Sequence, residues 1–199
     1  MSRATTATVL IVPGLRDHVP DHWQTLLQEE LERERVPVAC VPRRADAKLS
    51  CARWLEAIDQ SLAAIDGPVV LCAHSGGVLM VVHWAARHGT TRAIAGALLA
   101  TPADLESPLP PGYPTYEALR DNGWLPVPRV RLPFRAIVGA SSNDPLARHA
   151  RVAEFAEAWG ATLVELGAVG HLNPAAGYGP WPRARELLQP LISSAPLPS

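Results

Sequence analysis

The stretch Val69–Gly77, VVLCAHSGG, decides how the whole sequence is interpreted. An apolar run with the character of a buried strand leads directly into a serine flanked by small residues, and an apolar helical run follows from Val78. This order is typical of a nucleophile elbow, where a serine occupies a strained turn between strand and helix. Ala73 stands where the motif usually has its first glycine, so a plain glycine-rich turn is the alternative. We predict that Ser75 is a nucleophile held clear of a sheet.

Apolar runs of the same kind recur on both sides of this stretch. Each is rich in β-formers, bounded by Gly or Pro, and expected to be a strand buried on both faces. The predicted strands are Thr8–Val12, Val36–Val41, Val69–Ala73, Ile94–Ala100, Phe134–Gly139 and Ala161–Leu166. Helical patterns alternate with them, which implies crossover connections. We therefore expect an α/β three-layer sandwich: a mostly parallel six-stranded sheet with helices on both faces.

The predicted helices between these strands carry apolar stripes at helical spacing. The stripes are Trp23, Leu26, Leu27 and Leu31, then Trp54, Ile58, Leu62 and Ile65, then Val152, Phe155, Ala156 and Trp159. Asp21 is the expected N-cap of the first helix, with Gln24 placed as in a capping box, and Ser50 is the expected N-cap of the second. A last helix is expected from Pro182 to about Leu191.

The 199 residues suit one domain, residues 1–199. The connection 103–133 breaks the alternation because it is rich in proline, with room for one helical turn near Glu117–Arg120. A long irregular connection in a compact domain is usually a functional lid or a mobile loop, and we expect a lid-like role here. The tail 193–199 is expected to be frayed.

Composition excludes several classes of function. With 48% hydrophobic and 19% charged residues the chain has material for a core, which excludes disorder of the whole chain. A net charge of −1 provides no basic field for nucleic acid or an acidic membrane surface. No apolar segment is long enough to span a membrane, and no signal peptide is recognised, so a cytoplasmic location is expected. The 3 cysteines, without a CxxC pair, are expected to be reduced structural thiols.

A nucleophilic serine needs a base, and the base needs an orienting acid. Proteins with such an elbow supply serine, acid and histidine in that chain order. Asp144 follows the strand predicted at 134–139 and is the expected acid, the alternative being a cap of the next helix. Asp104 is the reserve, since it follows the preceding strand. His171 lies in the loop after the last strand and is the expected base, the alternative being a histidine bonded to a loop carbonyl.

An oxyanion hole needs two N–H donors near the nucleophile. Gly76 follows the serine, and Leu15 lies in the loop after the first strand, where Gly14 lets the chain turn inward. The pocket is expected to draw on His18, His22 and Trp23 near that same strand end, although a plain core role suits Trp23 equally well. His74 is expected to point away from the nucleophile's path. No metal site is expected, because the sequence holds no HExxH and no paired-Asp cluster.

With these residues in view, the sequence resembles the small serine hydrolases that include retinoblastoma-binding protein 9, within the α/β-hydrolase superfamily. The resemblance covers nearly the whole chain. It rests on Val12–Leu15, Pro20–Gln24, Ala73–Gly77, Ser141–Pro145 and Gly170–Pro182. It implies a minimal hydrolase fold without a large cap domain, and the triad Ser75, Asp144 and His171. Family members often carry two adjacent acids before the proline, whereas this chain has Asn143 in the first position.

The expected function is that of a cofactor-free serine hydrolase, carboxylesterase-like, that cleaves a small carboxylic ester or an amide through an acyl-enzyme. The expected partner is that small-molecule substrate, with no nucleic acid and no membrane. Two alternatives stay open. The same triad serves acyl transfer if another nucleophile replaces water. A protein-interaction module with an idle triad is the second, although the chain has no LxCxE run of the kind that would mark retinoblastoma binding.

Overall fold

The computed structural model describes residues 7–15, 19–42, 47, 49–88 and 92–193. Within these residues it contains a six-stranded sheet in the order β2-β1-β3-β4-β5-β6, and every neighbouring pair is parallel. The strands are β1 (Thr8–Val12), β2 (Val38–Cys40), β3 (Val69–His74), β4 (Ile94–Ala100), β5 (Ala136–Ser141) and β6 (Thr162–Gly167). The predicted α/β sandwich is confirmed.

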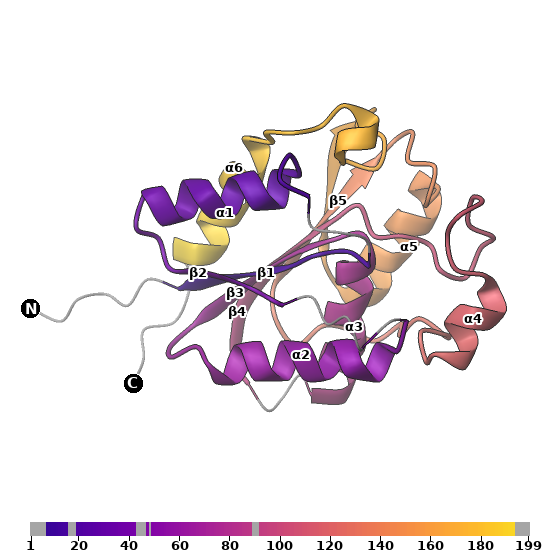
Figure 1. Ribbon diagram of the computed structural model, residues 1–199, viewed down its shortest axis with the longest axis horizontal. Helices are drawn as coiled ribbons and strands as arrows, with labels where there is room; N and C mark the ends of the chain where they lie inside the picture. Colours follow the sequence, from indigo (N-terminus) through magenta and orange to yellow (C-terminus); the bar gives the residue numbers. More distant parts are fainter. Residues whose placement is uncertain (1–6, 16–18, 43–46, 48, 89–91, 194–199) are drawn as a thin grey trace, which may run out of the picture.

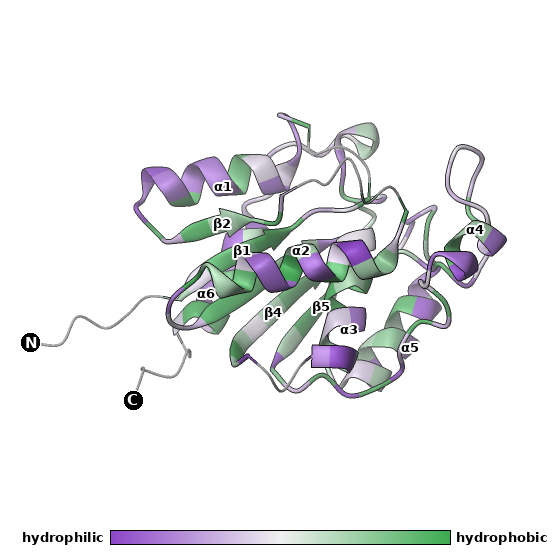
Figure 2. Cartoon of the chain, turned by 60° about the horizontal axis from the view of Figure 1, so that its bottom comes forward, coloured by the Kyte–Doolittle hydropathy of each residue, from purple (hydrophilic) through white to green (hydrophobic). Residues whose placement is uncertain are grey.

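Helices cover both faces of the sheet. On one face lie α1 (Trp23–Arg33) and α6 (Arg183–Ser193), and on the other α2 (Cys51–Ala63), α3 (Gly76–His88) and α5 (His149–Trp159) (Figure 1). Two short elements, α4 (Tyr116–Asp121) and the 3-10 turn η1 (Pro174–Ala176), complete the described part of the chain. The helices that cover the sheet turn hydrophobic residues toward it and polar residues outward, most plainly α1 and α2 (Figure 2).

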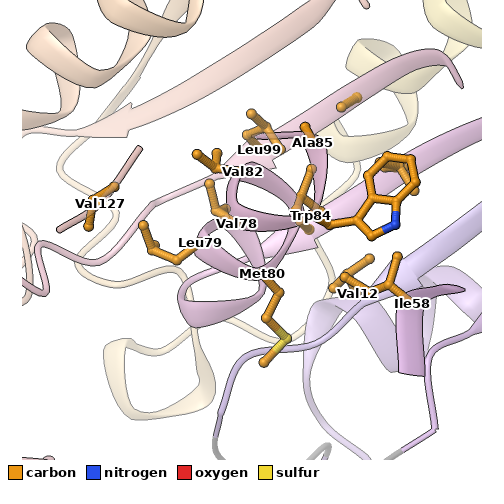
Figure 3. Packing of buried hydrophobic residues seen from close by; sticks show 14 of the residues in the cluster. Val12, Ile58, Val78, Leu79, Met80, Val82, Trp84, Ala85, Leu99 and Val127 are labelled. Atoms are coloured by element: carbon orange, nitrogen blue, oxygen red, sulfur yellow. The ribbon is translucent and has the colours of Figure 1, made fainter. Parts of the chain in front are cut away.

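The central strands alternate between two cores. Val9 and Ile11 join the cluster under α1 and α6, whereas Leu10 and Val12 join the cluster under α2, α3 and α5. Helix α3 is buried along most of its length in that second cluster, where Trp84 and Met80 lie near Val12 (Figure 3). Both faces of β1 are covered from Val9 to Val12, so these four buried side chains are all apolar.

Two local predictions were wrong. Helix α1 begins at Trp23 with His22 as its N-cap, where the sequence suggested Asp21, and the His22 Nδ1 accepts a hydrogen bond from the Gln24 backbone N–H. The Gln24 side chain does not close a capping box. It is buried and donates its amide hydrogens to the carbonyls of Val12, at the end of β1, and of Cys72, within β3.

The two outer strands, β2 and β6, depart from the prediction that every strand is buried on both faces. No residue of β2 and only Leu166 of β6 is buried, since each strand has one edge with no neighbouring strand in the described part of the chain. The apolar run at 161–166 suggested more burial than an edge position provides.

The Pro-rich connection 103–133 is anchored in the core along much of its length. Its buried apolar side chains are Ala103, Leu105, Leu119, Trp124, Val127 and Leu132. Trp124 is fully buried and donates its Nε1–H to the Leu49 carbonyl at 2.6 Å. The helical turn predicted near 117–120 is present as α4, which Thr115 caps by accepting from the Ala118 N–H. The Pro-rich connection is therefore attached to the core at several points.

Candidate active site

Ser75 lies in the turn between β3 and α3. Its φ of +56° is in the left-handed region, which costs a non-glycine residue energy and persists only where the surroundings enforce it. The surroundings do so, because a Cβ on Gly77 would collide with the carbonyl oxygens of Val12 and Pro13. The sheet and α3 thus approach so closely that only glycine fits at position 77, and the sharp turn lifts the Ser75 side chain out of the sheet.

Ser75, His171 and Asp144 come from three loops at the carboxyl edge of the sheet and meet in one hydrogen-bonded chain. The His171 Nε2 lies 2.7 Å from the Ser75 Oγ, where it can accept the hydroxyl proton. The His171 Nδ1 lies 2.8 Å and 3.0 Å from the two Asp144 carboxylate oxygens, which can only accept in the ionised form. A proton on Nδ1 leaves the lone pair of Nε2 facing the serine. This is the geometry of a nucleophile, a base and an orienting acid.

The histidine and the acid are withdrawn from water. The exposed fractions of their side chains are 6% for His171 and 2% for Asp144. The Leu146 N–H also donates to Asp144 at 2.8 Å, which fixes the carboxylate at the start of the segment that leads into α5. A hydrogen bond to a carboxylate in so dry a place is stronger than one in solvent.

Asn143 ties together the two loops that carry Asp144 and His171. Its Oδ1 accepts the Gly170 N–H at 2.6 Å and a second hydrogen bond from the Ser141 Oγ at 3.1 Å. Sequence reasoning noted Asn143 only as a departure from the family pattern and missed this tether. The departure is chemically conservative, since the amide oxygen is an acceptor just as a carboxylate oxygen is.

Two backbone amides, those of Leu15 and Gly76, lie near the serine. The Gly76 N–H is at the first position of α3, where a helix has no carbonyl for it. A Cβ on Gly76 would lie 3.3 Å from the Leu15 nitrogen, and one on Gly14 would lie 3.6 Å from the Ser75 Oγ. The loop after β1 therefore lies against the beginning of α3, which brings the amides of Leu15 and Gly76 close to the serine.

His74 is a second buried histidine behind the site, and its role was missed. Its Nε2–H donates to the His171 backbone carbonyl at 2.9 Å, and its ring lies between those of His22 and His171, at centroid distances of 4.8 Å and 5.0 Å. Burial, and next the neighbouring His171 and His22, lower the pKa of His74 well below its usual value, so its ring is neutral. Through this hydrogen bond the side chain supports the loop that carries His171.

The remaining candidates divide into pocket, core and surface. His22 borders the cavity at Ser75, whereas Trp23 is buried beneath it against Trp181, because the first turn of α1 directs its indole into the core. His18 lies outside the described residues. Asp104, the reserve acid, is turned away from His171: its carboxylate accepts from the Ser107 hydroxyl and the Glu106 N–H and pairs with Arg151 at 3.3 Å.

A cavity of about 950 Å³ opens at Ser75. Ser75, Gly76, Leu15 and His171 all line it, and the Pro-rich connection supplies a large part of its wall. From that connection come Ala103, Leu105, Leu109, Gly112, Tyr113, Pro114, Ala118 and Leu119. This volume is ample for a small-molecule substrate.

Neither a metal centre nor a membrane span is found among the residues the structure describes. No three His, Cys, Asp or Glu side chains of those residues gather so as to hold a metal ion. None of the described helices combines the length and the apolar character needed to cross a bilayer. The three thiols form no disulfide, and burial raises the pKa of Cys40 and of Cys51 to about 11, which keeps both protonated.

Comparison with known proteins agrees with this geometry. The model of the serine hydrolase family matches residues 9–190, and the chain belongs to that family. No curated protein was found to match the sequence.

Among solved structures, the chain is similar to a protein described as a YdeN-like hydrolase from Pectobacterium atrosepticum, with 30% identity and a TM-score of 0.78 over 96% of this chain and 94% of that one. The YdeN gene product of B. subtilis matches with 18% identity and a TM-score of 0.75, over 94% of this chain and 100% of that one. Est1E from Butyrivibrio proteoclasticus shares the fold at 14% identity and a TM-score of 0.66, over 96% and 90% of the chains. The protein is therefore a hydrolase with an α/β-hydrolase fold.

Proposed function

We propose that the protein is a serine esterase in which Ser75 is the nucleophile, His171 the general base and acid, and Asp144 the orienting acid. The observation that carries this is the continuous chain from the Ser75 Oγ through both His171 nitrogens to the Asp144 carboxylate, with distances of 2.7 Å and 2.8 Å. Membership of the serine hydrolase family supports it. The substrate is a small carboxylic ester or an amide, and the reaction uses only the protein's own groups and water.

Acylation begins when His171 Nε2 takes the Ser75 hydroxyl proton as Oγ bonds to the carbonyl carbon. The negative charge that develops on the carbonyl oxygen is stabilised by the amides of Leu15 and Gly76. The carbon–oxygen bond to the leaving group then breaks, and the leaving alcohol takes the proton from Nε2. Asp144 stabilises the positively charged imidazole between these two transfers.

Deacylation repeats the sequence with water. His171 removes a proton from a water molecule as its oxygen bonds to the acyl carbon, and the second tetrahedral intermediate collapses to release the carboxylic acid. The Ser75 Oγ recovers its proton from Nε2. Within the family, we further infer a place among the small hydrolases that include retinoblastoma-binding protein 9, on the strength of the run Gly170–Pro182.

Labelling with a fluorophosphonate probe tests the proposal directly. The Ser75 Oγ attacks phosphorus and fluoride leaves, so intact mass spectrometry is expected to show one adduct on the native chain and none on Ser75→Ala. Ser61→Ala is the matched control, because the Ser61 hydroxyl donates a hydrogen bond to the Ala57 carbonyl within α2. Labelling of this variant is expected to equal that of the native chain. If the folded native chain formed no adduct, the proposed esterase function would be rejected in favour of an interaction module with an idle triad.

A further inference from the structure

Two cavities meet at His171, and only one of them contains the reacting serine. The Ser75 cavity, already described, is lined from the ends of β1, β3 and β4. A smaller cavity of about 400 Å³ is lined by Asn143 and Pro145 after β5 and by Ala168 and Gly170 after β6. His171 borders both. Ser75, Leu15 and Gly76 border only the larger one.

This division assigns sides to a bound ester. The acyl carbon bonds to the Ser75 Oγ, and its oxygen faces the amides of Leu15 and Gly76, all of which line the larger cavity. The leaving oxygen must instead come within reach of the His171 Nε2, which gives it a proton. The acyl carbon and the chain attached to it therefore lie in the Ser75 cavity, and the leaving oxygen lies on the side of the serine that faces the His171 Nε2.

The walls of the Ser75 cavity set the chemistry of that acyl chain. Six leucines line it: Leu15, Leu49, Leu105, Leu109, Leu119 and Leu146. Among the described residues that line it there is no Asp, Glu, Lys or Arg. The side-chain N–H groups of the buried Gln24 already donate to the Val12 and Cys72 carbonyls, and the His74 Nε2–H donates to the His171 carbonyl. A charged acyl group would meet no oppositely charged Asp, Glu, Lys or Arg among the described residues of this lining, so its desolvation would be poorly compensated.

We propose that the preferred substrate carries an uncharged, apolar acyl chain longer than acetyl, and that Leu109 of the Pro-rich connection is a specificity-determining residue for its length. This inference rests on the proposed esterase. Leu109 lines the cavity and is only partly buried against the core, so exchanging it alters the cavity more than the fold. Each methylene group of the acyl chain that moves from water into apolar surroundings favours binding by a factor of about four.

The test is a series of p-nitrophenyl esters from acetate to octanoate, assayed as kcat/KM on the native chain, Leu109→Trp and Val130→Trp. In the native chain kcat/KM is expected to rise by about fourfold per methylene until the cavity is filled. Leu109→Trp is expected to lower kcat/KM for the octanoate ester at least about tenfold, because the indole occupies the space of the distal acyl chain. The value for the acetate ester is expected to stay nearly unchanged. Val130→Trp is the matched control, since Val130 belongs to the same connection but is 50% exposed and does not line the cavity.

A second comparison addresses charge. A p-nitrophenyl ester whose acyl chain ends in a carboxylate is expected to react at least about 100-fold more slowly than the neutral ester of equal length. Flat dependence on chain length in the native chain, or equal rates for the charged and neutral esters, would overturn this inference while fluorophosphonate labelling of Ser75 still upheld the esterase. Failure of that labelling overturns both. The native series needs no variant, so a misfolded Leu109→Trp does not leave the proposal open.

Discussion

The loops at the carboxyl edge of the sheet and the Pro-rich connection 103–133 face the same cavity, but different forces hold them. The edge loops are joined by hydrogen bonds between named atoms, such as Asn143 to the Gly170 N–H and His74 to the His171 carbonyl. The connection adds extensive apolar burial to its hydrogen bonds, with Trp124 fully enclosed. Directional bonds fix reacting atoms, whereas packing fixes a wall of a given shape and tolerates exchange of hydrophobic side chains of similar volume.

The difference teaches that chemistry and specificity are separable here. Each region also receives one buried histidine from the β3–α3 unit: His74 donates to the His171 carbonyl of the edge loops, and His83 donates to the Trp124 carbonyl of the connection. The central strand and helix thus support both regions through the same type of bond. Changes at the edge are expected to alter turnover, and changes in the connection to alter stability and substrate preference.

The largest effect is expected from Asp144→Asn. An amide in place of the carboxylate favours the wrong His171 tautomer, with the proton on Nε2, so kcat is expected to fall by about 10⁴-fold. The free energy of unfolding and the order of preference among ester lengths are expected to change little, since the cavity wall is untouched. Steady-state kinetics on the ester series and urea denaturation measure the two quantities.

Asn143→Asp is the neighbouring control for this variant. It keeps an acceptor for the Gly170 N–H and therefore preserves the tether between the loops. If Asn143→Asp lowered turnover as much as Asp144→Asn, the acid would not be Asp144 alone, and the assignment of separate roles to these adjacent residues would be lost.

Trp124→Ala tests the other side of the comparison. Removing a fully buried indole from the Pro-rich connection is expected to lower the free energy of unfolding by about 3–5 kcal/mol, because a cavity opens and the Leu49 carbonyl loses its donor. Val130→Ala, in the same connection but half-exposed, is expected to stay within about 0.5 kcal/mol. A loss below about 1 kcal/mol for Trp124→Ala would mean that the connection is a detachable lid and not a wall of the core.

The sequence predicted the parts of the molecule that follow from strong local patterns. Strand β4 was placed at its observed bounds, and the elbow at Ser75 was found because a buried strand, small residues and an apolar helix coincide there. The three loops that carry Ser75, Asp144 and His171 were placed correctly because ligand sites of parallel sheets gather at the strand ends. Which residue performs which chemical step stays a prediction until the variants are measured.

What the sequence did not show depends on contacts between distant segments. The hydrogen bonds of Gln24 to the Val12 and Cys72 carbonyls replaced the capping box, because tertiary partners were within reach. The exposure of β6 follows from the order of the strands, which local periodicity does not contain. His74 is the clearest case, since its partner lies 97 positions away in the chain.

The smallest expected effect concerns how the two supporting histidines respond to pH. Burial lowers the pKa of His74 well below 6.5 in the folded chain, and lowers that of His83 as well. Below about pH 6.5 the unfolded chain therefore binds protons that the folded chain does not, so the free energy of unfolding falls as pH falls, by at most about 1.4 kcal/mol per pH unit for each group.

His74→Gln, whose amide can still donate to the His171 carbonyl, is expected to flatten urea stability curves between about pH 7 and about pH 5. His83→Gln is expected to flatten them less, because the pKa of His83 is lowered by less than that of His74. Curves parallel to the native one for His74→Gln would show that the imidazole takes up its proton inside the fold, and that the edge loops are held no more rigidly than the wall.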